Sequence, residues 1–392
     1  MKIFHLSDLH IGLKLMNRDL AEDQAYIFDQ IAQLAHRHRP DAILIAGDIY
    51  DKAVPAAEAV ELFDHFIREL TEAVPESHIM LISGNHDSAK RVNVFRSVLE
   101  KQRIHMIGAA PALPEEYIEK VTLSDSFGQV HFYLLPFVRP SMVRLITGQE
   151  EDGSALSYDE ALHRLIGREQ IDRTQRNVLV SHQFYLPEGV NADDIERMDS
   201  EVCSVGNIDA VRSDVLRCFD YAALGHIHKP MKVGGEQWRY CGTPLACSVS
   251  EAGQKKGIVM VDLRARGDVQ IEVLPLKPLR EVRVIRGPLS EVLEQACPDF
   301  VTAVLTDKED LEVLDMQDRL REAFPMLLEI RRENTREAFY ASGGEPLREA
   351  DPYEMCCSFL KSTDEKEQEL LRNVINSVQM GDPHFSEDAI RR

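Results

Sequence analysis

The chain has 392 residues, a formal net charge of −21 and a hydrophobic fraction of 44%. Its length favours two or three domains, one of them large enough to bury a complete sheet. No run approaches the roughly 18 uninterrupted apolar residues of a membrane-spanning helix. The acidic charge alone argues against non-specific nucleic-acid binding, in which Lys and Arg neutralise phosphates. Acidic residues on remote faces would leave that possibility open.

Seven cysteines, none of them in a CxxC pair, argue against a disulfide framework and against a zinc ribbon. The first residues, KIFHL, have the pattern of a strand and not that of a secretion signal. We therefore expect a cytoplasmic protein.

The segment AILIAGDIYD, residues Ala42–Asp51, shows the pattern around which the first 230 residues are organised. Its wholly apolar run is typical of a strand buried on both faces, and it ends at Gly47 and the carboxylate of Asp48. Four other apolar runs also end in Asp, Asn or His, often beside a glycine. These are IFHLSDLH with Asp8 and His10, IMLISGNHD with Asn85 and His86, VLVSHQF with His182, and YAALGHIH with His226 and His228.

Ligands of open α/β sheets gather outside the carboxyl ends of the strands, so these side chains are expected at one edge. Carboxylate, amide and imidazole donors without thiolate suit Mn²⁺, Fe²⁺, Zn²⁺ or Mg²⁺. The donors are too many for one ion and about enough for two. A lone histidine at a strand end is more often structural, but five such ends within one domain favour a dinuclear site.

Amphipathic patterns between the apolar runs predict helices. The expected helices span Asp19–Arg39, Ala56–Ala73, Asn93–Lys101 and Glu160–Arg168. Strands and helices alternate, which implies crossover connections and a mostly parallel inner sheet. The segment VTLSDSFGQVHFYLLPFVRP predicts two strands joined at a glycine turn, and we interpret its His131 as structural.

The second half of this domain contains a long loop and several short strands. The polar loop Pro187–Val205 follows His182 and is a candidate to face substrate. Met231–Tyr240 and the segments CGTPLACSVSEAG, KKGIVMVDL and VQIEVLPL predict strands that close the second half of a sheet sandwich. Lys229 and Tyr240–Pro244 lie close in sequence to the ligands, and substrate contact and a structural role are equally supported for them.

A small α/β unit is expected after Pro275 and Pro278. Its predicted strands span Glu281–Arg286, Phe300–Thr306 and Leu327–Arg332, and its predicted helices span Leu289–Ala296 and Leu314–Phe324. The unit has no ligand-like cluster, so we expect it to have a binding or shaping role and not a catalytic one. Its arginines form either a strip that faces phosphates or solvated strand edges, and these are Arg280, Arg283, Arg286, Arg331 and Arg332.

The last fifty residues have the pattern of a linker and two short helices. Ser342–Pro352 is rich in Gly, Pro and charge. Pro352–Lys361 and Glu365–Val378 carry apolar faces that two short helices cannot bury alone, which favours a partner helix in a groove. The expected domains are residues 1–276, 277–341 and 342–392.

The predicted chemistry is that of a two-metal phosphoesterase. Asp48 would bridge the ions, because a carboxylate can offer one oxygen to each, and Asn85 would be a neutral ligand that leaves their charge undiminished. His86 would protonate the leaving oxygen or steady charge on the phosphate. A water whose pKa the ions lower would be the nucleophile.

The motifs DLH, GDIYD, GNHD, SHQ and GHIH, in this order, resemble the calcineurin-like metallophosphoesterase superfamily. The segments DLHIG, YAALGHIHKP and YCGTPLACSVSEAGQKKG narrow the resemblance to the bacterial SbcD nucleases. It covers the first 275 residues strongly. It extends more loosely to the small α/β unit, which is similar to a DNA-facing capping domain, and to the tail, which is similar to the segment that docks on the coiled coil of the ATPase SbcC.

The resemblance implies an α/β fold with a β-sandwich flanked by helices, a capping domain and a helical tail. It also implies one ion on Asp8, His10, Asp48 and His228, a second on Asp48, Asn85, His182 and His226, and His86 as the catalytic residue. The implied cofactor is Mn²⁺, and the implied assembly is a homodimer within a heterotetramer. Some relatives carry a His where this chain has Asp51.

The function expected from this resemblance is the nuclease subunit of an ATP-dependent DNA repair complex that cuts duplex ends, hairpins and single strands. A phosphoesterase of small molecules or phosphoproteins is the alternative, and the acidic charge favours it. The small α/β unit and the tail disfavour it, because a small substrate needs neither. A non-catalytic scaffold is disfavoured because every ligand position is filled.

Overall fold

The computed structural model describes residues 1–190, 195, 198–201, 209–307 and 313–333, which fall within one compact unit, Met1–Asn334. The predicted linker and helical tail, and residues 334–341 of the predicted small α/β unit, lie outside the described residues. Within the described ranges, no helix is both long and apolar enough to cross a membrane.

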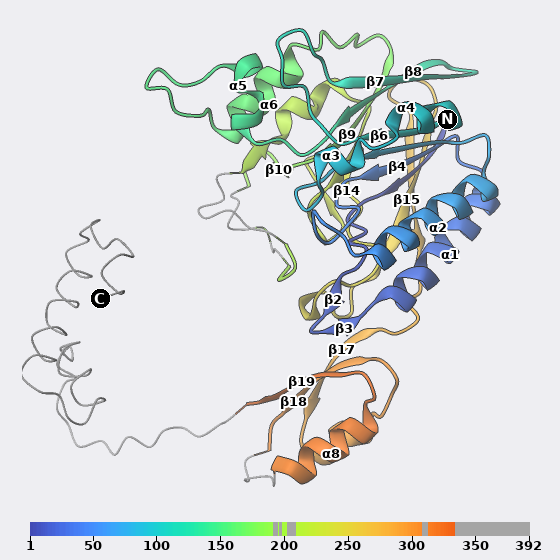
Figure 1. Ribbon diagram of the computed structural model, residues 1–392, viewed down its shortest axis with the longest axis vertical. Coiled ribbons are helices and arrows are strands. Elements are labelled where there is room, and N and C mark those ends of the chain that lie inside the picture. The colour runs from blue at the N-terminus through green and yellow to red at the C-terminus, as the bar shows by residue number, and fades with distance from the viewer. Residues whose placement is uncertain (191–194, 196–197, 202–208, 308–312, 334–392) are drawn as a thin grey trace, which may run out of the picture. The chain divides into compact units, whose positions relative to one another are not determined.

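Two six-stranded sheets form the main body of the fold (Figure 1). The first sheet consists, in spatial order, of β16 (Val269–Pro275), β15 (Gly257–Leu263), β1 (Lys2–Leu6), β4 (Ala42–Ala46), β5 (His78–Ile82) and β6 (Ile104–Ile107). The second consists of β13 (Met231–Lys232), β14 (Trp238–Tyr240), β12 (Tyr221–Gly225), β9 (Arg176–His182), β8 (Gly128–Leu135) and β7 (Glu119–Asp125). The inner strands of both sheets are parallel, as predicted. Antiparallel strands form three of the four edges, and the parallel strand β6 forms the fourth.

The two sheets pack on each other and bury both faces of their central strands. Along β4, Leu44 lies in the core between the sheets, whereas Ile43 and Ile45 lie in the core under the first pair of helices. Along β9, Val178 and Val180 face the first sheet. Because side chains alternate across a strand, a strand covered on both sides must be apolar throughout, which explains the uninterrupted AILIA run.

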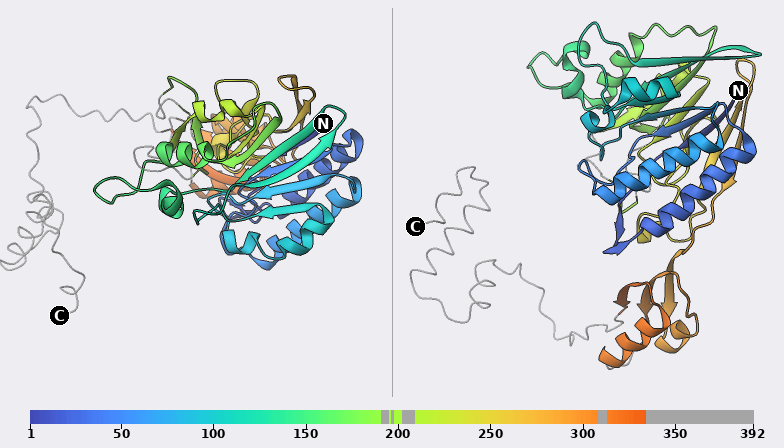
Figure 2. Two further views of the ribbon diagram at one scale, coloured as in Figure 1. Left: turned by 90° about the horizontal axis from the view of Figure 1, so that it is seen from above. Right: turned by 45° about the vertical axis from the view of Figure 1, so that its right-hand side comes forward.

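Helices cover the outer face of each sheet. α1 (Ala21–His38) and α2 (Ala57–Ala73) lie side by side on the first sheet (Figure 2). α5 (Pro140–Thr147), α6 (Tyr158–Gly167) and η4 (Ser213–Cys218) pack on the second. The remaining elements of this part are β2 (Lys14–Leu15), β3 (Arg18–Asp19), α3 (Ala89–Val92), α4 (Arg96–Leu99), η1 (Glu100–Gln102), β10 (Phe184–Leu186), β11 (Ala210–Arg212) and η5 (Val249–Glu251). The predicted β-sandwich flanked by helices is confirmed.

The small α/β unit has a sheet and a core of its own. Its parallel strands are β17 (Val282–Gly287), β18 (Phe300–Leu305) and β19 (Leu327–Arg332), with helices α7 (Leu289–Leu293) and α8 (Val313–Ala323). The unit is tied to α1, because Gln30 exchanges hydrogen bonds with the backbone of Lys277. Arg280 binds the buried carboxylate of Asp23 through two nitrogens, at 3.0 and 2.7 Å, and also binds Glu22.

The predicted phosphate-facing strip of arginines is not observed. Arg280 is bound to α1, Arg283 lies 3.5 Å from Asp299, and Arg331 binds Glu329 in its own strand. Arg286 binds Glu333 through both nitrogens of its fork, and Arg332 also has a partner. Arg280 and Arg286 meet carboxylates that lie 257 and 47 positions away, so the strip could not be excluded from the sequence alone.

The predicted helix over Asn93–Lys101 is observed only in part, as the short α4 and η1 from Arg96 onward. Phe95 has φ 61° in the left-handed region, and it separates the short helices α3 and α4. The Asn93 side chain accepts a hydrogen bond from the backbone of Gly108, which holds the chain away from a helical path. Val94, Phe95 and Val98 are consequently 50%, 73% and 60% exposed, and do not form the buried helix face that their spacing predicted.

The predicted closure of the sandwich is wrong in two respects. KKGIVMVDL and VQIEVLPL form β15 and β16, which extend the first sheet beside β1 and not the second. CGTPLACSVSEAG is a loop with the single turn η5 and contains no strand. Strand periodicity predicts that a segment is a strand, but it does not say which free edge the strand will join.

Candidate metal centre

The seven candidate ligands and His86 come together at the carboxyl ends of five strands. Asp8 and His10 follow β1, Asp48 follows β4, and Asn85 and His86 follow β5 in the first sheet. In the second sheet, His182 is the last residue of β9, and His226 and His228 follow β12. Of these eight side chains, only Asn85 and His86 are half-buried and the other six are buried.

One cluster consists of Asp8, His10 and His228, whose donor atoms all lie within 4.8 Å of one another. His228 Nε2 lies 3.1 Å from His10 Nε2 and 4.0 Å from Asp8 Oδ1. Two nitrogens and one oxygen therefore surround a single point, which is the arrangement of a cation site.

A second cluster is centred on Asn85. Its Oδ1 lies 3.0 Å from His182 Nε2 and 2.9 Å from His226 Nδ1. Asp48 lies between the two clusters, because its Oδ2 is 3.3 Å from His182 Nε2 and 3.7 Å from His10 Nε2. One carboxylate thus faces both clusters, as a bridging ligand must.

The hydrogen-bonding states of the histidines fit a pair of cations. His182 Nδ1 donates to the carbonyl of Ala46, at 2.7 Å, so a neutral His182 presents the lone pair of Nε2 to the site. His228 Nδ1 donates to Ser200 Oγ, at 2.7 Å, because that hydroxyl donates in turn to the carboxylate of Glu251. The inward nitrogens of both rings are therefore acceptors that face other acceptors, and a cation satisfies such a set.

The electrostatics of the site show an excess of negative charge. Burial raises the pKa of Asp8 to about 6. Burial lowers the pKa of His182, but the charges of Asp48 and Asp8 outweigh it and raise that pKa to about 9. Burial acts to raise the pKa of Asp48, but the interactions of Asp48 with His182 outweigh burial and hold this pKa well below its usual range. Without a cation, protons balance these carboxylates.

Strained backbone positions mark the ligand loops. Asp8, His10, Asp48 and His226 have φ values of 53°, 43°, 49° and 104°. Such values are uncommon for residues other than glycine and persist only where the surrounding structure enforces them. Four of the seven candidate ligands lie at such positions, so the loops are shaped to place donors at a cost in backbone energy.

Two glycines beside the ligands are required by close packing. A Cβ on Gly84 would lie 2.1 Å from Asp48 Oδ1, and a Cβ on Gly225 would lie 1.9 Å from the carbonyl oxygen of Ala46. Any side chain at either position would displace the strand end that carries a ligand. This explains why glycine recurs beside the Asp, Asn and His residues in the sequence.

Two polar side chains hold the ligand loops from behind. Gln24 of α1 donates to the carbonyls of Leu9 and His10 and accepts from the amide of Gly12. Asp87 accepts from the amides of Ile49, Tyr50 and Gly84, which binds the loop after β4 to the loop after β5. Burial and the nearby charge of Asp48 raise the pKa of Asp87 to about 6.

A buried network supports His228. Glu251, which is 1% exposed, accepts hydrogen bonds from Ser200, Thr243 and Lys256 at 2.6–2.9 Å. Glu201 accepts from the amide of His228, at 2.8 Å. Ser200 and Glu201 belong to the loop that was expected to face substrate, so this described part of it supports a candidate ligand.

His86 is held with one nitrogen free. Its amide donates to Asp48 Oδ1 at 2.9 Å, and its Nδ1 donates to the carbonyl oxygen of Asp51 at 2.8 Å. The ring packs edge-on against His10, with 4.9 Å between the ring centroids. Asp51 therefore contributes its backbone, and among the described residues no hydrogen bond engages Nε2 of His86.

Several of these contacts were not predicted from the sequence. Asp87 stands in the GNHD motif and Glu251 in the SVSEAG segment, yet neither had been given a role. Gln24 is an ordinary polar residue of a helix pattern and carried no signal. Among the residues of open role, Tyr240 is buried and its hydroxyl binds the backbone of Gln183 and Tyr185, which makes it structural.

Two sequence profiles and one nuclease subunit match most of this chain. A sequence profile described as calcineurin-like phosphoesterase matches residues 1–230, and a profile described as type 5 capsule protein repressor C-terminal domain matches residues 278–364. The SbcD subunit of the nuclease SbcCD from Staphylococcus epidermidis is 32% identical over 297 residues, which cover 75% of each chain.

Two solved structures are similar at lower identity. The protein TT1561 of Thermus thermophilus is 16% identical, with a TM-score of 0.38, and the match covers 69% of this chain and 98% of that one. A dimetal phosphatase from Danio rerio is 14% identical, with a TM-score of 0.41, over 71% of this chain and 98% of that one.

The profile match spans 230 of the 392 residues, and the match to the nuclease SbcD spans three quarters of the chain. The profile match includes all five strand ends that carry the candidate ligands. The chain therefore belongs to the calcineurin-like metallophosphoesterases and, within them, to the SbcD nucleases, which are metal-dependent hydrolases.

Proposed function

We propose that the chain hydrolyses DNA phosphodiester bonds at a pair of divalent ions, as the nuclease subunit of an ATP-dependent repair complex. Its expected activities are exonuclease action on duplex ends and endonuclease action on single strands and hairpins. The observation that carries the proposal is the placement of Asp48 Oδ2 between two donor clusters, 3.3 Å from His182 and 3.7 Å from His10.

The proposed ligand sets follow the two clusters. One ion would be held by Asp8, His10, Asp48 and His228, and the other by Asp48, Asn85, His182 and His226. The donors suit Mn²⁺, which is the proposed ion. When bound, the ions supply Lewis-acid charge and lower the pKa of the attacking water.

His86 is the proposed general acid. Because its Nδ1–H is bound to the carbonyl of Asp51, Nε2 is the nitrogen that can hold a second proton and deliver it to the leaving oxygen. Asn85 contributes no charge, so the positive charge of the ion pair remains available to the phosphate. Asp48 would bind both ions, and it also accepts a hydrogen bond from the amide of His86, which ties the proposed acid to the proposed bridging ligand.

The proposed partner is an SbcC-type coiled-coil ATPase that binds the segment 342–392, and the proposed assembly is a homodimer within a heterotetramer. The domain limits 1–276, 277–341 and 342–392 belong to this proposal. Exposed apolar side chains at Val94, Phe95 and Val98 support a contact between two copies of the chain, because large apolar groups seldom cluster on a free surface.

A phosphoesterase of small molecules or phosphoproteins is the second candidate. The net charge of −21 favours it, because an acidic chain repels the DNA backbone. The same ligands and the same His86 would serve it, so the metal centre alone does not distinguish the two. The substrate must therefore be tested directly.

The decisive experiment uses the purified chain with Mn²⁺ and a labelled DNA hairpin, with and without the ATPase and ATP. We expect cutting that the partner stimulates. The variant His86→Ala should bind both ions, because no ligand is lost, and should cut at least about 100-fold more slowly. Hydrolysis of a simple phosphodiester without any DNA cutting would support the second candidate instead.

The role of the tail is tested by deleting the residues beyond Ala350. The truncated chain should keep the hydrolysis of a simple phosphodiester, because the metal centre lies within the first 230 residues. It should no longer co-purify with the coiled-coil ATPase. Co-purification of the truncated chain with the ATPase would show that the docking segment lies elsewhere.

A further inference from the structure

A small cavity lies directly beside the metal centre. Its volume is about 180 Å³, and one wall is formed by Asn85, His86 and His226. Phe137, Arg139 and Tyr158, from the β8–α5 loop and the start of α6, form another part of the wall. Nothing in the ligand sets or in the role of His86 uses these three residues.

Phe137 is rigidly joined to the metal centre. Its ring lies roughly parallel to that of His226, with 6.4 Å between centroids and 25° between planes, and meets His182 edge-on at the same distance. Its amide donates to the carbonyl of Ser83 at 3.0 Å, at the end of the strand that leads to Asn85. The position of Phe137 relative to both candidate ligands is therefore fixed by packing and by backbone.

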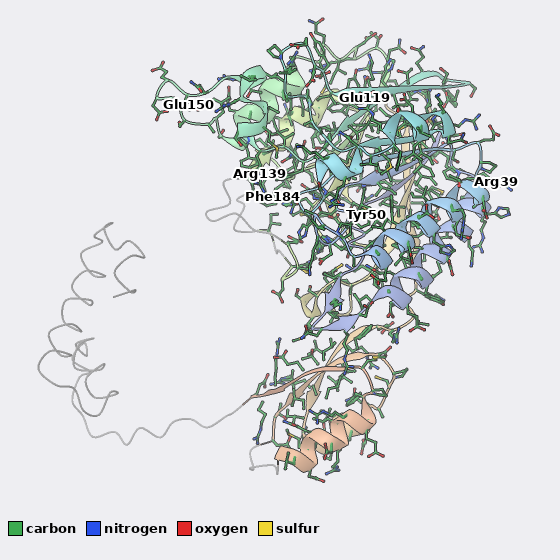
Figure 3. All side chains as sticks on the ribbon, viewed as in Figure 1. Arg39, Tyr50, Glu119, Arg139, Glu150 and Phe184 are labelled. Carbon is green, nitrogen blue, oxygen red and sulfur yellow. The ribbon has the colours of Figure 1, made fainter. Side chains whose placement is uncertain are left out.

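Arg139 lies over this ring. Its guanidinium carbon is 5.9 Å from the centroid of Phe137, within the range of a cation–π contact. Arg139 is labelled in Figure 3. Phe184, labelled in the same figure, also contacts His226 with its ring. Within the described ranges Arg139 forms no ion pair, whereas Arg280, by contrast, binds two carboxylates.

The free charge of Arg139 is notable in a chain of net charge −21. The side chain is exposed and lines a cavity next to the point where a phosphate must bind. Asp209, the carboxylate in the cavity wall, lies 3.9 Å from His226 Nε2, so its charge is directed to that histidine. A guanidinium fork that is not engaged by a carboxylate matches the geometry of a phosphate.

The size of the cavity indicates what it can hold. Pockets that enclose a whole small molecule measure about 300–1,000 Å³, and this cavity is smaller. It has room for one phosphate group of a longer substrate that continues outside it. The half-buried Tyr158 offers a hydroxyl as a second donor on the same wall.

We propose that Arg139, held over Phe137, binds the phosphate next to the scissile one in a DNA strand. This inference rests on the proposed function and deepens it, because the enzyme would bind two consecutive phosphates of the DNA strand. A substrate with a single phosphate would occupy the metal centre and leave Arg139 unused. The site would thereby favour polynucleotides over phosphomonoesters and isolated phosphodiesters.

The test compares three dinucleotides in Mn²⁺, namely thymidylyl-thymidine and its forms with an added 5′- or 3′-terminal phosphate. One added phosphate should raise kcat/KM by about 10- to 100-fold, the range expected for hydrogen bonds to a charged group. In Arg139→Ala this gain should disappear, while the metal content stays unchanged. A gain that survives in Arg139→Ala, or no gain in the unmodified protein, would overturn the proposal.

Arg144→Ala is the matched control, because Arg144 is also exposed on α5 and its loss changes the net charge equally. It does not line the cavity, so the gain from the added phosphate should be retained. If Arg144→Ala removes the gain as well, the effect comes from general charge and not from a phosphate site.

A binding measurement without metal gives an independent readout. The association constant of the protein for a fluorescent single-stranded oligonucleotide is measured at several salt concentrations in EDTA. A plot of the logarithm of this constant against the logarithm of the salt concentration falls with salt, and in Arg139→Ala the magnitude of its slope should be smaller by about 0.7. An unchanged slope would contradict a phosphate contact. If the unmodified protein cuts no DNA hairpin at all, the proposed function fails, whereas cutting without dependence on Arg139 refutes only this inference.

Discussion

Three histidines of the centre each use one ring nitrogen for the protein and present the other to the site. His182 donates through Nδ1 to Ala46, His228 to Ser200, and His86 to the backbone of Asp51. Partners of this kind fix both the tautomer and the orientation of a ring, and their loss commonly costs metal affinity about 10- to 100-fold. The donors are thus set before any ion arrives.

A first prediction concerns Glu251, which orients His228 through Ser200. Glu251→Gln should weaken metal binding by about 10- to 100-fold, because Ser200 loses its charged acceptor. Competition titration with a metal-sensitive dye measures this affinity. Lys256→Met, added to Glu251→Gln, removes the buried cation left without its partner and should restore stability but not affinity.

Glu236→Gln is the matched control for that substitution, because Glu236 is an exposed residue paired with Lys232 away from the ligands. Its metal affinity should equal that of the unmodified chain. A folded Glu251→Gln protein with unchanged affinity would show that Ser200 alone orients His228.

A second prediction concerns the pH dependence of metal binding. In the metal-free protein the pKa of Asp8 is about 6 and that of His182 about 9, both above their unfolded values of about 3.9 and 6.5. Their contribution to stability is therefore present at low pH and is lost as the pH rises through these values. A bound ion displaces the proton of His182 up to about pH 9 and that of Asp8 only below about pH 6, so affinity should rise about tenfold per pH unit for each proton still bound.

Thermal unfolding with Mn²⁺ and with EDTA between pH 5.5 and 8 measures this linkage. The difference in Tm between the two conditions should grow steadily with pH. A constant difference would show that the ion does not compete with these protons. Asp8→Asn, which removes one of the two titrating groups, should flatten the dependence.

At the residue scale, the sequence predicted which donors meet but not how they are held. Asp8, Asp48 and His182 stand at the ends of apolar runs, and parallel strand ends meet at one edge, so their proximity followed from pattern. Glu251 and Gln24 reach the centre through contacts between distant segments, and no periodicity marks such contacts. Asp51 holds His86 through its backbone carbonyl, and a backbone contact cannot be predicted from the type of side chain.

The strands themselves were predicted closely, both β4, which is buried on both faces, and β19, whose side chains are half-buried or exposed. β4 and β19 begin and end at the predicted residues, Ala42–Ala46 and Leu327–Arg332. The start of the helix predicted over Asn93–Lys101 was wrong, because an apolar residue every three or four positions does not reveal a left-handed residue such as Phe95. The placement of β15 failed because pairing with β1 depends on which sheet edge is free.

A third prediction concerns the hairpin of β7 and β8, which Arg176 of β9 ties to β15. This buried guanidinium binds Asp125 at 2.5 and 3.0 Å and also the carbonyls of Gly128 and Leu263. Burial acts to raise the pKa of Asp125, but Arg176 outweighs it and lowers that pKa. Asp125→Asn should reduce the free energy of unfolding at pH 7 by roughly 1–2 kcal/mol.

The sign of the pH dependence follows from that lowered pKa. The stabilisation is present above the unfolded value of about 3.9 and is lost as the pH falls toward the folded value. Urea unfolding at pH 7, 5 and 3 should therefore show a difference between the two proteins that shrinks with acidity. Asp268→Asn, at an exposed carboxylate, is the control and should be neutral at each pH.

For the molecule as a whole, the exposed group of Val94, Phe95 and Val98 gives a fourth prediction. If two copies of the chain cover it, Phe95→Glu should yield monomers of 44.5 kDa in light scattering, with circular dichroism unchanged. Leu314→Glu, at an equally exposed position on α8, should leave the dimer intact. A Phe95→Glu protein with the mass of two chains would place the contact on another surface.

Composition predicted the class of the molecule but misled about its charged surfaces. Arginines of the small α/β unit, which looked like a phosphate strip, are bound by carboxylates, and Arg280 meets Asp23 from 257 positions away. Arg139 carried no signal in the sequence, because its freedom from carboxylates is a property of its surroundings. Charge counts report what a chain contains, and only the fold decides which charges remain free.

The first turn of α1 joins two distant parts of the protein. Asp23 holds Arg280 of the small α/β unit, and the next residue, Gln24, holds the backbone of the His10 loop. A displacement of the small sheet that pulls on Arg280 would therefore act, one peptide bond away, on the loop of the candidate ligand His10. The first turn of α1 is a direct mechanical link between the small α/β unit and the candidate metal centre.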